Sequence, residues 1–277
     1  MRFTFALGLA LGLAVAAPAI AADTTMGEQW PLKKQEWSFD GMLGAYNRTD
    51  LQHGFQVYKE VCAACHSLDR VAFHSLSESG GPGFSDAQMK AIAAGYQINA
   101  EPNDKGETTD DKGNPLKRPG IPADHFPAPF ANENAARASN GGALPPDLSL
   151  IVKARAGGPD YVYSILTGFH EKPPAGFKVT ENKYFNPYFV GWNISMPPPL
   201  QDGQVTFNDW DPKKKATIAD EAAAVVTFLA WASEPHLEDR HRIGLGVMIF
   251  LIVLAGLLYL TYRQVWHGDD DDKNGKH

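Results

Sequence analysis

The pattern of apolar and polar residues divides the chain into a short apolar start, a long mixed middle and one apolar segment near the end. The segment at residues 243–262 contains 20 residues without a charge. At about 1.5 Å per residue, a helix of that length spans roughly 30 Å, the thickness of a bilayer core. A buried core helix is rarely apolar on every face. We therefore predict one transmembrane helix, with its bounds placed at residues 241–263.

The apolar start has the features of an export signal. Arg2 supplies a positive charge, residues 3–17 are mostly apolar, and small residues surround a cleavage point after Ala21. We predict a signal peptide at residues 1–21, with an uncleaved anchor helix as the alternative.

Lys and Arg residues flank the span on both sides, so their distribution barely indicates which side is cytoplasmic. Export of the mature chain would set the topology instead. The prediction is a single-pass protein of a bacterial inner membrane. Residues 22–240 would form a periplasmic domain, and residues 264–277 a short cytoplasmic tail.

The mixed middle contains short helical patterns separated by stretches rich in Gly and Pro. Strand-like alternation of comparable strength is missing from it. We predict a mainly α domain with long loops. The expected helices lie at residues 51–61 with Asp50 as cap, at 86–96 after Ser85, at 147–155 with Asp147 as cap, at 159–168, and at 218–233 before Pro235.

Composition and charge narrow the class of function. The net charge of -7 argues against a nucleic-acid partner, since binding phosphates needs a basic surface. Short helices with long loops bury little apolar surface for each residue that they order. A large apolar cofactor would supply the missing core.

The residues Cys62, Cys65 and His66 form a C-x-x-C-H motif, and the chain has no further cysteine. This motif is typical of covalent c-type haem attachment. Two thiols at this spacing reach the two vinyl groups of one porphyrin, and the adjacent histidine lies beneath the iron. The alternatives are a redox dithiol, a structural disulfide or half of a zinc site.

The sixth iron ligand decides what such a haem does. Met196 is the candidate, because it precedes three prolines that stiffen its loop, and a Met/His pair favours electron transfer. A methionine that only fills the core is the alternative. Candidates for the haem propionates are Arg155, Lys153 and Arg118, and the pair Pro145–Pro146 could offer a carbonyl to the second nitrogen of His66.

Several ordered blocks give the chain a resemblance to a known family. They lie at residues 54–59, 62–66, 118–120, 143–149, 160–164, 166–168, 184–189, 196–199 and 231–235. Together they resemble the cytochrome c1 family, the haem subunits of ubiquinol:cytochrome c oxidoreductase, the cytochrome bc1 complex. The resemblance implies a class I cytochrome c-like haem domain with long loop insertions and one covalently bound haem c. It implies His66 and Met196 as axial ligands, Arg155 at a propionate, and Tyr58, Pro145 and Tyr161 near the haem.

The same resemblance implies a function and partners. The chain would accept one electron from a Rieske iron–sulfur protein and pass it to a soluble cytochrome c, beside cytochrome b, during ubiquinol oxidation coupled to proton translocation. It would be an electron carrier within an enzyme complex. One alternative is an anchored c-type cytochrome that serves another oxidase. The other is a haem peroxidase or gas sensor with a displaceable sixth ligand.

An acidic stretch at residues 101–114 contains five acidic and two basic residues without apolar periodicity. We predict an exposed loop that attracts a basic cytochrome c, with Glu107, Asp110 and Asp111 as its main charges. Four other acidic residues could add to the negative electrostatic field of this loop: Glu171, Asp202, Asp209 and Asp211. A solvated linker is the alternative.

Overall fold

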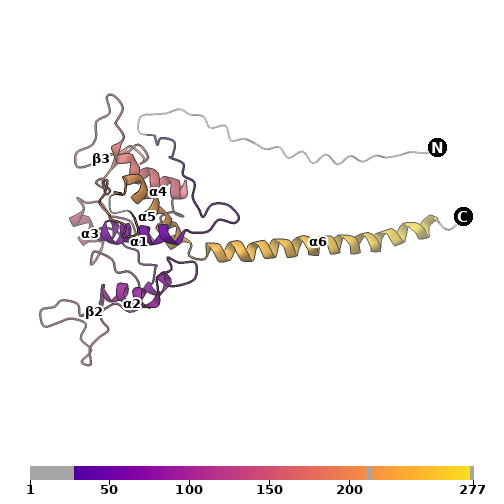
Figure 1. Ribbon diagram of the computed structural model, residues 1–277, viewed down its shortest axis with the longest axis horizontal. Helices are drawn as coiled ribbons and strands as arrows, with labels where there is room; N and C mark the ends of the chain where they lie inside the picture. Colours follow the sequence, from indigo (N-terminus) through magenta and orange to yellow (C-terminus); the bar gives the residue numbers. More distant parts are fainter. Residues whose placement is uncertain (1–27, 211–213, 275–277) are drawn as a thin grey trace.

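Two helices, α1 (Arg48–Glu60) and α5 (Ile218–Ser233), pack against each other at the centre of the fold (Figure 1). The computed structural model describes residues 28–210 and 214–274. The predicted signal peptide and Asp211 lie outside the described residues. Gly54 brings the two helices into close contact, because a Cβ atom at this position would lie 2.1 Å from the carbonyl oxygen of Ala224.

The bounds of α5 agree with the sequence pattern, whereas α1 starts earlier than predicted. Thr217 and Asp220 form a capping box at the start of α5. At α1, the side chain of Asn47 accepts a hydrogen bond from the amide of Thr49 at 3.0 Å. The predicted cap, Asp50, therefore lies in the first turn of the helix, where its negative charge still favours the helix dipole.

Two further helices follow the prediction closely. α2 (Asp86–Ala94) begins after Ser85, which forms a capping box with Gln88. α4 (Gly158–Thr167) has Pro159 in its first turn, where the missing amide proton costs no hydrogen bond. Both patterns are local, so the sequence alone predicts them well.

The helix predicted at residues 147–155 is wrong, since that segment consists of turns. The carboxylate of Asp147 accepts hydrogen bonds from the amides of Ser149, at 2.9 Å, and Asp69, at 3.0 Å. It therefore ties a turn to a distant loop and starts no helix. A short helix that we did not predict, α3 (Glu133–Ser139), begins after Asn132, whose side chain caps it.

Short strands and single turns of 3-10 helix complete the haem-motif domain. β1 (Gln97–Asn99) pairs antiparallel with β2 (Lys117–Pro119), and β3 (Tyr184–Phe185) pairs antiparallel with β4 (Asn193–Ile194). Two or three residues are too few to show alternation along the sequence. The 3-10 turns are η1 (Cys62–Ala64), η2 (Phe73–Leu76) and η3 (Gly168–His170).

The last helix, α6 (Leu237–Asn274), extends away from the rest of the structure (Figure 1). Its apolar part, Leu237–Trp266, has 30 residues and a mean hydropathy of 2.7, which is long and apolar enough to cross a membrane. The predicted span at 241–263 lies within it. The fold class is confirmed: a mainly helical protein with one long apolar C-terminal helix.

Candidate functional site

The C-x-x-C-H motif lies where α1 passes into the single turn η1. The amides of Cys65 and His66 both donate hydrogen bonds to the carbonyl oxygen of Cys62, at 3.1 and 2.9 Å. This turn brings the two thiols and the imidazole together at the end of one helix. Cys62 is half-buried, Cys65 is exposed, and both thiols are free.

His66 is oriented by a residue 80 positions further along the chain. Its Nδ1 lies 2.8 Å from the carbonyl oxygen of Pro146. A carbonyl only accepts, so Nδ1 carries the proton and Nε2 keeps its lone pair for a metal. The carbonyl that we predicted from Pro145–Pro146 is confirmed as that of Pro146, and Pro145 lies half-buried beside it. Burial lowers the pKa of His66, although Pro146 and Asp147 oppose this effect, and a neutral imidazole is the form that ligates metals.

Tyr58 lies directly behind the motif, with 1% of its surface exposed. Its hydroxyl lies 3.4 Å from the carbonyl oxygen of His66, and its ring packs against Phe126 and Phe228. Burial raises the pKa of Tyr58, and nearby Tyr96, Cys62 and Asp147 raise it further. The structure therefore places Tyr58 beside the motif.

Tyr96 is a residue of this region that our reading of the sequence missed. Its hydroxyl is buried and has no hydrogen-bond partner in the part of the chain that the structure describes. Its ring packs against Phe73 and Phe126, next to Tyr58. In the sequence it reads only as the end of a helix, so no local signal marks it.

Met196 belongs to a second, smaller apolar cluster built on Ile165, Tyr188 and Ile194. Cys62 packs against the main core, and Tyr161 packs against both clusters. The motif and the candidate sixth ligand therefore lie on two apolar clusters that Tyr161 connects.

Arg155 is the cationic candidate that the structure places beside Tyr161. Burial raises the pKa of Tyr161, and the nearby positive charge of Arg155 partly lowers it again. Arg155 is exposed and pairs with no carboxylate among the described residues. Its guanidinium keeps donors for another acid group.

The other two cationic candidates already have acidic partners. Arg118 holds both carboxylate oxygens of Asp124, at 2.5 and 2.9 Å, and also contacts Glu101. Lys153 pairs with Glu234 at 2.8 Å. Arg155 therefore lies near Tyr161 without a carboxylate partner among the described residues, whereas Arg118 and Lys153 are committed to other pairs.

The rival interpretations of the motif have less support. A redox dithiol depends on a lowered thiol pKa, but burial raises the pKa of Cys62 to about 12. A zinc site needs four ligands. No group of three or more His, Cys, Asp or Glu side chains able to hold a metal occurs within residues 28–210 and 214–274.

The residues fit a covalently bound haem c. The donor set consists of two free thiols, an imidazole with a free Nε2, and a half-buried thioether on a proline-stiffened loop. The unpaired hydroxyl of Tyr96 and the free donors of Arg155 match the polar needs of buried propionates. This arrangement defines a c-type haem protein.

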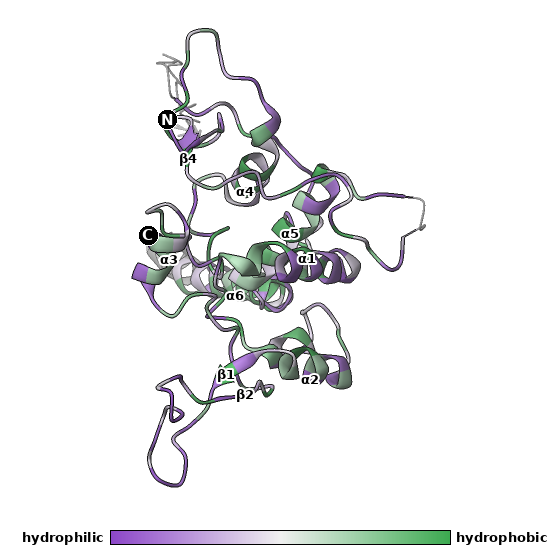
Figure 2. Ribbon diagram, turned by 90° about the vertical axis from the view of Figure 1, so that its left-hand side faces the viewer, coloured by the Kyte–Doolittle hydropathy of each residue, from purple (hydrophilic) through white to green (hydrophobic). Residues whose placement is uncertain are grey.

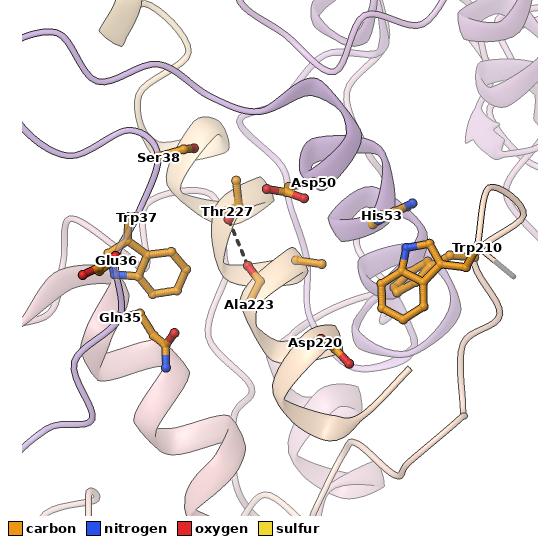
Figure 3. Close-up of a pocket in the computed structure, with 12 residues that line it drawn as sticks. Gln35, Glu36, Trp37, Ser38, Asp50, His53, Trp210, Asp220, Ala223 and Thr227 are labelled. Carbon is orange, nitrogen blue, oxygen red and sulfur yellow. Dashed lines mark hydrogen bonds between the residues drawn. The ribbon is translucent and has the colours of Figure 1, made fainter. Parts of the chain in front are cut away.

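A separate hollow of about 240 Å³ lies between α1, α5 and the segment before α1 (Figure 3). Trp37, Asp50, His53 and Trp210 line it, and Thr227 donates a hydrogen bond to the carbonyl of Ala223 within it. It contains none of the predicted haem residues, so it is distinct from the site above.

Comparisons with known proteins agree with this class. Residues 37–268 match the model of the Cytochrome C1 family. The chain is 42% identical over 280 residues to "Cytochrome c1" from Rhodospirillum rubrum, covering 96% of each protein. It is 47% identical over 230 residues to "Cytochrome c1, heme protein, mitochondrial" from Kluyveromyces lactis, covering 83% of this chain and 72% of that one.

A third relative is longer. The chain is 49% identical over 249 residues to "Cytochrome b/c1" from Bradyrhizobium diazoefficiens, which covers 83% of this chain but 35% of that protein. The chain therefore spans about a third of this relative. The chain belongs to the cytochrome c1 family, and the predicted cofactor, one covalent haem c, is that of the family.

Proposed function

We propose that this chain is the electron-transfer haem subunit of a cytochrome bc1 complex. The observation that carries the proposal is the geometry of His66, whose Nδ1 is fixed by Pro146 beside the two motif thiols, in a chain of the cytochrome c1 family. The full-length match to a cytochrome c1 supports the same function.

The chain's own residues have distinct tasks in this proposal. Cys62 and Cys65 would hold the porphyrin through thioether bonds, so the cofactor would stay bound in both redox states. His66 and Met196 would hold the iron, and Arg155 would neutralise a propionate near Tyr161. When bound, haem supplies a one-electron Fe(III)/Fe(II) couple, whose potential Met/His ligation raises.

The proposed donor is a Rieske iron–sulfur protein and the proposed acceptor a soluble cytochrome c. Rieske centres have potentials of roughly -150 to +300 mV, so the next carrier needs a potential near or above that range. The name of the Bradyrhizobium relative, "Cytochrome b/c1", supports cytochrome b as the neighbouring subunit. The rival functions are an anchored cytochrome for another oxidase, and a haem peroxidase or gas sensor.

The proposed docking element for the acceptor is the acidic loop between β1 and β2, which extends from the body and is strongly hydrophilic (Figure 2). Asn103 and Asp110 each cap a turn, because their side chains accept hydrogen bonds from backbone amides two and four residues further on. The turns hold Asp104 and Asp111 exposed at the surface. A basic partner would meet this charge before contact.

The proposed topology is a cleaved signal peptide at 1–21, a periplasmic domain at 22–240, a span at 241–263 and a cytoplasmic tail at 264–277 in a bacterial inner membrane. Truncation after Arg242 tests it, since the variant keeps the contacts of Glu238, Arg240 and His241 with the domain. We expect a soluble periplasmic fragment that contains haem. A fragment that leaves the membrane fraction only in detergent would contradict a single transmembrane anchor.

The function is tested by purifying the full chain from membranes under mild detergent. We expect a b-type cytochrome and a Rieske protein in the same complex, together with ubiquinol-dependent reduction of a soluble cytochrome c. Isolation with an oxidase and without a b-type cytochrome would favour an anchored cytochrome that serves another oxidase. Ready binding of carbon monoxide to the reduced protein would favour the peroxidase or sensor.

A further inference from the structure

Two of the most exposed apolar side chains in the structure lie on a short loop before α1. Met42 is 76% exposed and Leu43 78%. These fractions exceed those of the large apolar residues along the span itself, where Ile252 reaches 67%. A soluble surface rarely presents adjacent large apolar side chains to this extent without a partner.

This loop, residues 40–44, is rigidly held. The amide of Ala45 donates to the carbonyl of Ser38 at 3.0 Å and closes its base. A Cβ atom at Gly44 would lie 2.3 Å from the carbonyl carbon and oxygen of Phe39, so only glycine fits there. Phe39 and Tyr46 flank the loop and are buried against each other. The backbone thus presents Met42 and Leu43 in a defined position.

Contacts with α6 fix the loop beside the start of the span. The carbonyl of Gly44 accepts a hydrogen bond from Nδ1 of His241 at 3.0 Å. The carboxylate of Glu238 accepts from the amide of Tyr46 at 3.0 Å and pairs with Arg48 at 2.7 Å. In Figure 1 the indigo loop before α1 lies beside the first turns of α6.

Met42 lies beside residues of α6 that belong to the uncharged part of the span. It lines a hollow of about 730 Å³ together with Leu245 and Met248 of α6. Met248 follows Arg242, the last charged residue before the uncharged segment at residues 243–262, by roughly 9 Å along the helix axis at 1.5 Å per residue. Interfacial segments bury their apolar face to about this depth, 5–10 Å.

We propose that the loop of residues 40–44 is a second membrane contact. Met42 and Leu43 enter the leaflet next to the haem-binding domain, and acyl chains of phospholipids fill the hollow against Leu245 and Met248. The apolar surface of the loop is continuous with that of the span, so the same bilayer covers both.

The charged residues that line the hollow suit a zwitterionic phospholipid. Lys153 and Arg240 both pair with Glu234, at 2.8 and 2.5 Å, and Asp40 also lines the hollow. Two positive and two negative side chains leave no net charge for an anionic headgroup. Two contacts, the span and the loop, would fix the tilt of the domain over the membrane, which a single helix leaves free.

The test uses single cysteine labels on the full chain, purified from membranes with the subunits that accompany it. Haem attachment consumes Cys62 and Cys65, so an added cysteine is the one free thiol of this chain, and the same labelling of the unaltered complex measures the signal from other subunits. The variants Met42→Cys and Leu43→Cys, and the control Val190→Cys, carry an environment-sensitive fluorophore. Val190 is a suitable control because it is apolar and 71% exposed but absent from the lining of the hollow. Each is placed in nanodiscs of phosphatidylcholine with or without brominated acyl chains.

We expect bromine to reduce the emission at positions 42 and 43, because groups at the acyl boundary lie within reach of brominated chains, and to leave position 190 unchanged. Adding an anionic lipid should not strengthen the effect. Labels at 42 and 43 that respond to aqueous iodide and not to bromine would overturn the proposal. So would labels shielded from both quenchers, since a helix of another subunit would then occupy the hollow. An unchanged haem spectrum establishes that each variant is folded.

Discussion

The carbonyl oxygen of Pro146 lies 2.8 Å from Nδ1 of His66 and accepts its hydrogen bond. The two residues are 80 positions apart, yet this bond decides which imidazole nitrogen remains free for iron. The amide of Leu148 donates to the carbonyl of Ser67 at 2.9 Å and holds the two segments together. The imidazole of His66 is thus oriented by a segment that lies far from it in the sequence.

Replacing Met196 with Leu tests the sixth ligand. We expect covalent haem to remain attached, because Cys62 and Cys65 hold it, and the reduction potential to fall. A fall of about 59 mV changes a one-electron equilibrium tenfold, so turnover with ubiquinol should fail. Redox titration and the sulfur-to-iron absorption band measure the change. Met89→Leu, at a buried position on α2, is the control, and an unchanged potential in Met196→Leu would remove this residue from the site.

Reversing Asp104 and Asp111 to Lys tests the acidic loop. Both are exposed, whereas Glu107 and Asp110 hold the turns through Asn103 and Asn114 and are left intact. We expect association with a basic cytochrome c to slow about tenfold at low salt, with a weaker dependence on ionic strength.

The haem potential of this variant should not change. Reversal of two exposed residues elsewhere, Glu36 and Glu181, serves as the control for net charge. Equal association rates and salt slopes in both variants and the unaltered protein would mean that the loop is only a linker.

Replacing Gly54 with Ala tests the contact between α1 and α5. The added methyl group would lie 2.1 Å from the carbonyl oxygen of Ala224, so the helices must separate. We expect a loss of about 1–3 kcal/mol in the free energy of unfolding, measured by denaturant titration. Gly95→Ala is the matched control, because its nearest atom would be 3.3 Å away. Equal losses in both variants would contradict the close crossing.

Asp160 ties the segment before α1 to α4, since it accepts hydrogen bonds from Nε1 of Trp37 and Nζ of Lys34, both at 2.8 Å. Burial alone would raise the pKa of Asp160, but these bonds outweigh it and lower the pKa below 3.8. The stabilisation is therefore fully present above pH 3.8 and is lost as the pH falls through the folded-state pKa.

Asp160→Asn should accordingly cost about 1–3 kcal/mol at neutral pH. Thermal unfolding measured between pH 7 and pH 3 should show that the difference from the unaltered protein shrinks with acid. Asp104→Asn, on the exposed loop, is the control. A difference that stays constant across this range would show that the charge of Asp160 is not involved.

Glu221 is a buried carboxyl group on α5, with Oε1 accepting from the amide of Val205 at 2.9 Å. Burial raises the pKa of Glu221 above 4.5. The folded protein thus keeps a proton that the unfolded chain has lost, and stability falls as the pH rises from 4.5 to the folded-state pKa. The fall amounts to about 1.4 kcal/mol for each pKa unit.

Glu221→Gln should remove that fall, because the amide mimics the protonated acid. We expect the variant to be at least as stable as the unaltered protein at pH 7, as measured by thermal unfolding over pH 4–8. Glu133→Gln, at an exposed position, should keep the original profile. A marked loss of stability in Glu221→Gln at pH 7 would show that the carboxylate is charged in the folded state.

Features written in neighbouring residues could be predicted from the sequence. The bounds of α5, the capping box at Ser85 and the span all follow from patterns within a few turns of chain. The haem motif is local as well, since one helical turn brings Cys62, Cys65 and His66 together. Local hydrogen bonding and periodicity decide these features, so distant parts of the chain matter little to them.

Features that depend on distant partners were decided only by the tertiary structure. Asp147 begins no helix because it bonds Asp69, across 78 residues of chain. Arg118 is already paired with Asp124, whereas Arg155 has no carboxylate partner in the part of the chain that the structure describes. Tyr96 stands out because its buried hydroxyl has no hydrogen-bond partner among the described residues, and Met42 because it lies beside Leu245 and Met248 of α6. The sequence therefore determined which groups carry the chemistry and where the membrane helix lies. Packing between remote segments decided the tautomer of His66, the ion pairs of the cationic candidates and the position of the loop at residues 40–44, because each depends on contacts that no local pattern encodes.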